Sequence, residues 1–130
     1  MPNGRLILIV DDEPTLIRGV QLRLQRAGFE TIVAHDGRMA LELARQRRPD
    51  LILMDFEMPI MDGITALGLL REQRETDGLP VIMNSGRESD RNEAIMAGAS
   101  GFLSKPFSGN ELVSLIDPLI RVRCASIGSG

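Results

Sequence analysis

Short apolar runs alternate along this chain with longer stretches that have the period of an amphipathic helix, and this alternation limits the possible folds more than any other feature. Several of the short runs are apolar at every position, as strands covered by helices on both faces must be. They predict strands at Leu6–Val10, Glu30–Ala34, Leu51–Met54, Val81–Asn84 and Gly101–Leu103. Five strand–helix repeats of this kind predict an α/β fold with a doubly wound parallel sheet.

Capping residues and helix breakers set the expected ends of the helices. The first helix is expected to begin at Pro14 and to stop at Gly28, because proline suits a first helical position and glycine a terminator. Three further helices are expected after Asp36 and ending before Pro49, after Asp62, and over Asp90–Ala97 with Gly98 as terminator. Ser108 and Glu111 have the spacing of a capping box and predict the start of the fifth helix.

The C-terminal end of the chain is expected to lie outside the packed domain. Pro118 removes a backbone hydrogen bond, at a cost of ~3 kcal/mol in a helix interior, so the fifth helix is expected to kink or end near Asp117. A chain of 130 residues has room for one core. We therefore expect one domain over residues 1–122 and a disordered tail or linker stub over residues 123–130.

Composition excludes several classes of function. A net charge of -3 gives no basic excess for nucleic acid, and no apolar run approaches the ~20 residues of a membrane span. The N-terminus also lacks the pattern of a signal peptide, so a cytoplasmic protein is expected. The single cysteine, Cys124, has no thiol partner, which leaves neither a disulfide framework nor a zinc site.

Polar side chains follow four of the predicted strands. Asp11 and Asp12 follow the first, Asp55 the third, Ser85 the fourth, and Lys105 lies just beyond the fifth. In a doubly wound sheet, ligands bind at the carboxyl ends of the strands, where these residues are expected to gather.

This group of residues predicts magnesium and phosphoryl chemistry. Three carboxylates in one pocket raise one another's pKa unless a cation lies among them, and oxygen ligands with open positions favour Mg²⁺. A carboxylate can also act as the nucleophile that takes a phosphoryl group and forms an acyl phosphate. Lys105 and Ser85 would then supply a positive charge and a hydroxyl donor for the phosphoryl oxygens.

Four stretches together resemble the receiver domain of two-component response regulators: LILIVDDEPT, LILMDFEMPIMDG, VIMNSG and GASGFLSKPF. The resemblance covers the chain from about Leu6 to Ile120. It implies a flavodoxin-like (βα)5 sheet with strand order 2-1-3-4-5. It also implies a phosphorelay module that is phosphorylated on Asp55 by a sensor histidine kinase or phosphotransfer protein and that catalyses its own phosphorylation and dephosphorylation.

The resemblance further assigns roles to single residues. Asp12 and Asp55 would ligate Mg²⁺ directly, Asp11 would help through water, and the backbone carbonyl of Glu57 would complete the protein ligands. Ser85 would move toward the phosphoryl group, with Lys105 as its ion-pair partner. The side chains of Glu57 and Arg87 would flank the path of the hydrolytic water and could pair with each other, and the Lys105–Pro106 peptide would be cis.

Output is expected through a change of surface. Phosphorylation would shift a pre-existing equilibrium toward an inward Phe102, which would occupy volume that Ser85 vacates. The face around the fourth helix, the fifth strand and the fifth helix would then rearrange. That face would bind a downstream effector or output domain, or form a homodimer. Two residues depart from the family pattern: Asn84 adds an amide that needs a partner, and Gly86 loosens the backbone next to Ser85.

Two other functions fit parts of the pattern. The stretch DDEPT also resembles the nucleophile loop of haloacid-dehalogenase-type phosphatases, with Asp11 as nucleophile and Thr15 in the loop. In that case Glu13 would have to be the general acid, and the second acidic pair of such a site is missing from the sequence. A pseudo-receiver that binds a partner without being phosphorylated is the third candidate, although Asp12, Asp55 and Lys105 are all present.

Overall fold

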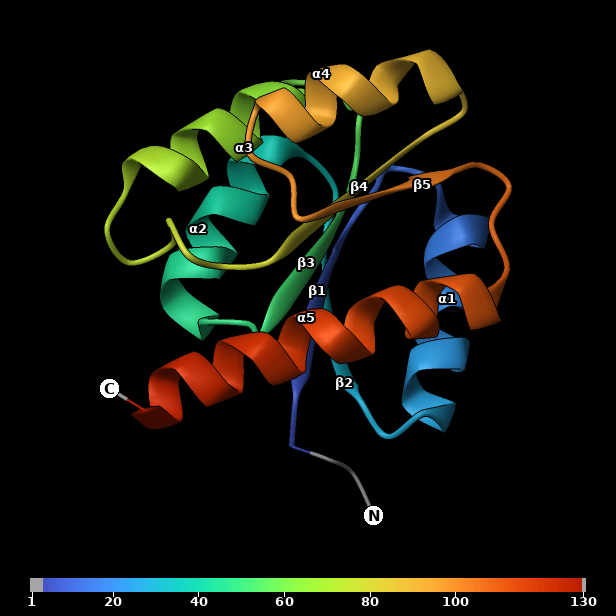
Figure 1. The fold of residues 1–130 in the computed structure, drawn as a ribbon. Coiled ribbons are helices and arrows are strands. Elements are labelled where there is room, and N and C mark those ends of the chain that lie inside the picture. The colour runs from blue at the N-terminus through green and yellow to red at the C-terminus, as the bar shows by residue number, and fades with distance from the viewer. Residues whose placement is uncertain (1–3, 130) are drawn as a thin grey trace.

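Five parallel strands form the single sheet of this chain (Figure 1). The computed structural model describes residues 4–129, with side chains as far as residue 121. The strands are β1 (Leu6–Val10), β2 (Glu30–Ala34), β3 (Leu51–Asp55), β4 (Val81–Ser85) and β5 (Gly101–Ser104), in the order β2-β1-β3-β4-β5. The predicted fold class and strand order are confirmed.

Strands β3, β4 and β5 each run one residue further than the apolar pattern indicated. Asp55 pairs with Asn84 across β3 and β4, and Ser85 pairs with Ser104 across β4 and β5. Asp55 and Ser85 are therefore held by the sheet ladder, which fixes their backbones more firmly than a loop would.

The helices cover both faces of the sheet. They are α1 (Pro14–Arg26), α2 (Gly37–Arg47), α3 (Gly63–Glu72), the 3₁₀ turn η1 (Glu88–Asp90), α4 (Arg91–Met96) and α5 (Gly109–Ser129). Apolar side chains of α1 and α5 pack with alternate strand residues on one face, and those of α2, α3 and α4 pack on the other (Figure 1). The central strands β1, β3 and β4 are buried at nearly every position, which explains their continuous apolar runs.

Three predicted helix starts carry the expected side-chain caps. Asp36 Oδ1 accepts a hydrogen bond from the Met39 amide at 2.8 Å, and Asp62 Oδ1 accepts one from the Thr65 amide at 2.8 Å. Ser108 and Glu111 exchange two bonds of 3.0 Å, the reciprocal pattern of a capping box.

The last helix was expected to kink or end near Asp117, and it does not end there. α5 continues past Pro118 to Ser129, so residues 123–129 extend this helix where a tail or linker stub was expected. Ile116 and Ile120 are both buried against the sheet, one on each side of the exposed proline. Their packing keeps the helix in place across the one backbone hydrogen bond that proline removes. The side chain of Cys124 lies outside the described residues.

The fourth helix is shorter than expected at its start. Asp90 is both the last residue of the 3₁₀ turn and the N-cap residue of α4, but its carboxylate makes no capping hydrogen bond. The carboxylate is instead engaged by a side chain from β4, as the next subsection shows. Gly98 has φ +109 and ends the helix as predicted.

Candidate active site

The sheet brings Asp11 and Asp55 side by side. Val10 pairs with Met54, so Asp11 and Asp55, the next residue in each chain segment, follow at the same edge of β1 and β3. Both belong to the alternate positions that face α1 and α5. Asp11 is 1% exposed and Asp55 7% exposed, whereas Asp12 is exposed to solvent.

These three aspartates form a group that fits a divalent cation. Asp11, Asp12 and Asp55 each offer a carboxylate oxygen, and the three oxygens lie within 4.8 Å of one another. Carboxylate oxygens are the ligands that Mg²⁺ prefers, and the exposed position of Asp12 leaves room for the waters that this ion retains. The fold therefore brings together the three carboxylates that the sequence singled out, with Asp11 and Asp55 buried and Asp12 exposed.

Lys105 lies between the two buried carboxylates. Its Nζ is 3.2 Å from Asp55 Oδ1 and 3.5 Å from Asp11 Oδ2. Asp11 Oδ1 also accepts a hydrogen bond from the Glu13 amide at 2.9 Å. The lysine thus offsets part of the repulsion between two carboxylates that would otherwise face each other in a buried site.

The balance of charge still disfavours an ionised Asp55. Burial, followed by the neighbouring charge of Asp11, raises the pKa of Asp55, and the opposing effects of Lys105 and the Glu57 backbone do not cancel this. Burial alone would lower the pKa of Lys105, but the charges of Asp55 and Asp11 outweigh it and raise that pKa. A further cation beside Asp55 would therefore stabilise the charged carboxylate that nucleophilic attack requires.

The hydroxyl of Ser85 is bonded to Asp90 and not to Asp11, Asp12 or Asp55. Its Oγ donates to Asp90 Oδ2 at 2.6 Å and accepts a hydrogen bond from the Arg87 amide at 3.1 Å. Ser85 nevertheless lines the same cavity of about 370 Å³ as Asp55, together with Glu57, Gly86, Arg87 and Lys105. The predicted site residues of β3, β4 and β5 are therefore collected in one cavity, with the serine hydroxyl engaged elsewhere.

Two charged residues bridge the rim of this cavity. Arg87 Nη2 lies 3.0 Å from Glu57 Oε1, so the predicted pairing of these side chains is confirmed. Arg87 Nε also lies 3.3 Å from Asp90 Oδ2. Sequence reasoning treated Asp90 only as a helix start; the available signal was its opposite charge three residues after Arg87.

Phe102 is already buried in the unphosphorylated chain. It is 4% exposed, and the guanidinium carbon of Arg91 stands 4.9 Å from the centre of its ring. Glu88 holds Arg91 in this position. Its carboxylate forms an ion pair with Arg91 at 2.5 Å and also accepts a hydrogen bond from the Ser104 hydroxyl. The ring is thus covered by Arg91 while Ser85 binds Asp90. A shift of Phe102 toward an inward position on phosphorylation stays a prediction.

Asn84 introduces the polar atom that the sequence predicted. The residue is 1% exposed, and its Oδ1 has no hydrogen-bond partner among the residues that the structure describes. Gly86, the other departure, has open space where a Cβ would lie. The Lys105–Pro106 peptide is cis, as predicted.

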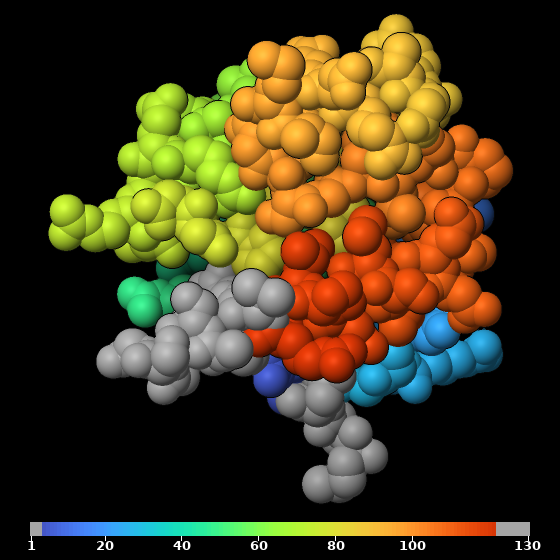
Figure 2. All heavy atoms as spheres, viewed as in Figure 1, coloured from blue at the N-terminus to red at the C-terminus, as the bar shows by residue number. Residues whose placement is uncertain are grey.

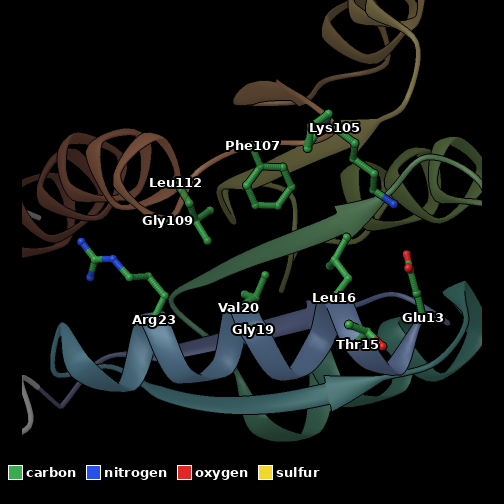
Figure 3. Close-up of a pocket in the computed structure, with 11 residues that line it drawn as sticks. Glu13, Thr15, Leu16, Gly19, Val20, Arg23, Lys105, Phe107, Gly109 and Leu112 are labelled. Atoms are coloured by element: carbon green, nitrogen blue, oxygen red, sulfur yellow. The ribbon is translucent and has the colours of Figure 1, made fainter.

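A second and larger cavity opens beside the site, between α1 and the start of α5 (Figure 3). It has a volume of about 610 Å³, and its lining includes Leu16, Val20, Phe107 and Leu112. Lys105 also lines this groove, at the end where Glu13 lies (Figure 3). Because its walls are mainly apolar, the groove is distinct from the acidic cavity that contains Asp55.

Comparison with known proteins identifies this arrangement. The family model for the response regulator receiver domain matches residues 7–117. The transcriptional regulatory protein PrrA of Mycobacterium tuberculosis is 38% identical over 119 residues, which cover 90% of this chain and 50% of PrrA. The chain therefore spans about half the length of the curated relatives it matches.

Solved structures agree in fold. The chemotaxis response regulator CheY4 of Vibrio cholerae superposes with a TM-score of 0.83 at 33% identity, covering 88% of this chain and 98% of that one. The receiver domain of the sensor histidine kinase PA1611 of Pseudomonas aeruginosa gives a TM-score of 0.83 at 31% identity, covering 90% of this chain and 98% of that one. That structure has a magnesium ion coordinated in its active-site cleft.

The chain is a doubly wound α/β protein with an acidic site at the carboxyl edge of its sheet. It belongs to the family of response regulator receiver domains. In the part of the chain that the structure describes, no helix has both the length and the apolar character needed to cross a membrane.

Proposed function

We propose that this chain is the phosphoacceptor of a two-component phosphorelay and that Asp55 is the residue phosphorylated. The observation that carries the proposal is the position of Asp55, which is buried at the end of β3 within 4.8 Å of two further carboxylates and 3.2 Å from Lys105. A sensor histidine kinase or phosphotransfer protein would supply the phosphoryl group. The phosphoryl transfer would take place in the cytoplasm.

The proposed reaction is an in-line displacement at phosphorus. An Asp55 carboxylate oxygen attacks the phosphorus of a phosphohistidine, the phosphorus–nitrogen bond breaks, and the imidazole leaves with the electron pair. The new oxygen–phosphorus bond makes Asp55 an acyl phosphate. Hydrolysis by water then returns the carboxylate and releases inorganic phosphate.

The residues around Asp55 have separate roles in this reaction. Asp11, Asp12 and Asp55, with the backbone carbonyl of Glu57, would hold Mg²⁺, which when bound supplies positive charge for the phosphoryl oxygens. Lys105 is free to move its charge from the Asp55 carboxylate to a phosphoryl oxygen, because its side chain lines the same cavity. Ser85 would donate its hydroxyl to another of these oxygens.

Output would pass through the segment that follows Ser85. Figure 2 shows that α4, the region after β5 and the first part of α5 form one continuous face of the molecule. On α4 the side chains of Ile95 and Met96 are 48% and 89% exposed. A shift of Ser85 toward the phosphoryl group would move η1 and α4, and this face would then bind an effector, an output domain or a second copy of the chain.

The alternative functions have less support. A phosphatase that used Asp11 as nucleophile would need Glu13 as its general acid and a second acidic pair after a later strand, and the sequence lacks that pair. A receiver that is never phosphorylated would not need Asp12 and Lys105 beside Asp55. Family membership also favours the phosphoacceptor.

The test is phosphorylation by a small phosphodonor such as acetyl phosphate, followed by intact mass measurement. We expect one phosphoryl group on the parent chain with Mg²⁺ and none in the presence of a chelator. Asp55→Asn should remain unmodified, whereas Asp36→Asn, which removes an aspartate that only caps α2, should react like the parent. Equal labelling of Asp55→Asn and parent would contradict the assignment.

A further inference from the structure

Asp90 binds the hydroxyl that the proposed phosphorylation needs. Asp90 is 7% exposed, and its Oδ2 receives the Ser85 hydroxyl at 2.6 Å. A serine hydroxyl has one proton to donate. Ser85 therefore cannot donate to a phosphoryl oxygen on Asp55 while it donates to Asp90.

The same carboxylate oxygen is tied to the rim of the active-site cavity. Arg87 Nε reaches Asp90 Oδ2 at 3.3 Å, while Arg87 Nη2 reaches Glu57 Oε1 at 3.0 Å. The amide of Arg87 also donates to Ser85 Oγ at 3.1 Å. Arg87 thus holds both members of the Ser85–Asp90 pair and links them to the residue two positions after Asp55.

We infer that Asp90 is a positioning residue that holds the Ser85 hydroxyl in the resting state and competes with the phosphoryl group for it. The inference rests on the proposed function. A buried carboxylate and a phosphoryl group are both anionic acceptors, so the two hydrogen bonds are of similar strength and the exchange is nearly balanced. Arg87 remains as an ion-pair partner of Asp90 once the serine hydroxyl leaves, so the buried carboxylate is not left unpaired.

The exchange would also carry the signal outward. Asp90 is the last residue of η1, and α4 begins at the next residue. The Asp90 carboxylate contacts Ser85 and Arg87, so loss of the Ser85 bond removes one of the contacts that join the end of η1 to the site. The Asp90 carboxylate is therefore the point at which a change at Asp55 reaches α4.

The test uses beryllofluoride, a mimic of the phosphoryl group, with the full chain and excess Mg²⁺. Its affinity is measured by calorimetry for the parent, Asp90→Asn, Ser85→Ala and the double variant, after thermal melting has shown that each is folded. Asparagine keeps the shape of the side chain but is a weaker acceptor than a carboxylate, so Asp90→Asn should bind beryllofluoride about tenfold more tightly, equal to about 1.4 kcal/mol. In the Ser85→Ala background, the same change should have little effect, because no hydroxyl remains to be released.

A control separates this effect from loss of one negative charge. Glu93→Gln removes a charge from the exposed side of α4 and should leave the affinity within twofold of the parent. Unchanged affinity in Asp90→Asn would overturn the role of Asp90, and so would an equal gain with and without Ser85. If the parent and Asp55→Asn bind beryllofluoride equally poorly, the proposed function fails and this inference with it, whereas normal binding by the parent with no gain in Asp90→Asn removes only the inference.

Discussion

Neutralising Asp55 should make the unphosphorylated protein more stable at neutral pH. The Asp55 side chain is 10% exposed and faces Lys105 at 3.2 Å, an attraction of about 5 kcal/mol at an effective dielectric constant of about 20. Its repulsion from the Asp11 carboxylate, within 4.8 Å, is about 3.5 kcal/mol or more on the same scale. The remaining attraction, about 1.5 kcal/mol, is smaller than the several kcal/mol that desolvation of a buried carboxylate costs.

Asp55→Asn should therefore raise the free energy of unfolding by an amount on the order of 1 kcal/mol at pH 7 in the absence of divalent metal. The pH dependence follows from the raised pKa of Asp55 in the folded protein. A group with a raised folded pKa favours folding below its unfolded pKa, and this advantage is lost as the pH rises through the folded pKa. The two proteins should thus be equally stable below pH 3.8, the ordinary pKa of an aspartate, and their stabilities should diverge above it.

Urea denaturation of chelator-treated protein, repeated from acid to neutral pH, measures this difference. Asp117→Asn is the matched control, because Asp117 is exposed and the same single charge is removed. A less stable Asp55→Asn at pH 7 would mean that the attraction to Lys105 dominates and that the reasoning about burial is wrong.

Four other changes test separate parts of the structure. Mg²⁺ at a hundred times its dissociation constant should stabilise the parent by about 2.7 kcal/mol, visible as a rise in melting temperature, and Asp12→Asn should lose most of this gain. Ser108→Ala should lower the free energy of unfolding in urea by about 1 kcal/mol, because it removes half of a capping box; an unchanged value would show that the cap is not formed in solution. Gly63→Ala would place a Cβ 2.1 Å from a β3 carbonyl oxygen and should cost about 3 kcal/mol, whereas Gly68→Ala, which has open space in the same helix, should be neutral or stabilising by thermal melting. Glu57→Ala should change the dephosphorylation rate, followed by intact mass, while leaving Mg²⁺ affinity within about twofold; equal decay in parent and variant would remove the water-path role of this side chain.

Much of the fold could be predicted because several local signals agreed. Apolar strands, the capping aspartates at positions 36 and 62, and the Ser108–Glu111 box each indicated the element that the structure contains. The effect of Pro118 on the last helix was overestimated because the penalty of a proline is local. The burial of Ile116 and Ile120 against the sheet stabilises the helix on both sides of the proline, and a helix pattern alone does not reveal this packing.

The members of the candidate site and the Glu57–Arg87 pair could be predicted, but the resting contact of Ser85 could not. Asp11, Asp55 and Lys105 follow parallel strands, so their meeting at one edge is a consequence of topology. The direction of the Ser85 hydroxyl depends on a rotamer and on a residue five positions later in the chain, Asp90. Neither the serine rotamer nor the Ser85–Asp90 contact has a sequence signature. The packing of Arg91 over the Phe102 ring has none either.

The location of the phosphoryl group is the most direct test of the account. After reaction with a small phosphodonor and Mg²⁺, borohydride reduces an aspartyl phosphate to homoserine, and peptide sequencing by mass spectrometry shows which aspartate was converted. The account predicts conversion of Asp55 alone. Conversion of Asp11 or Asp12 would contradict it and would make an aspartate after β1 the nucleophile instead.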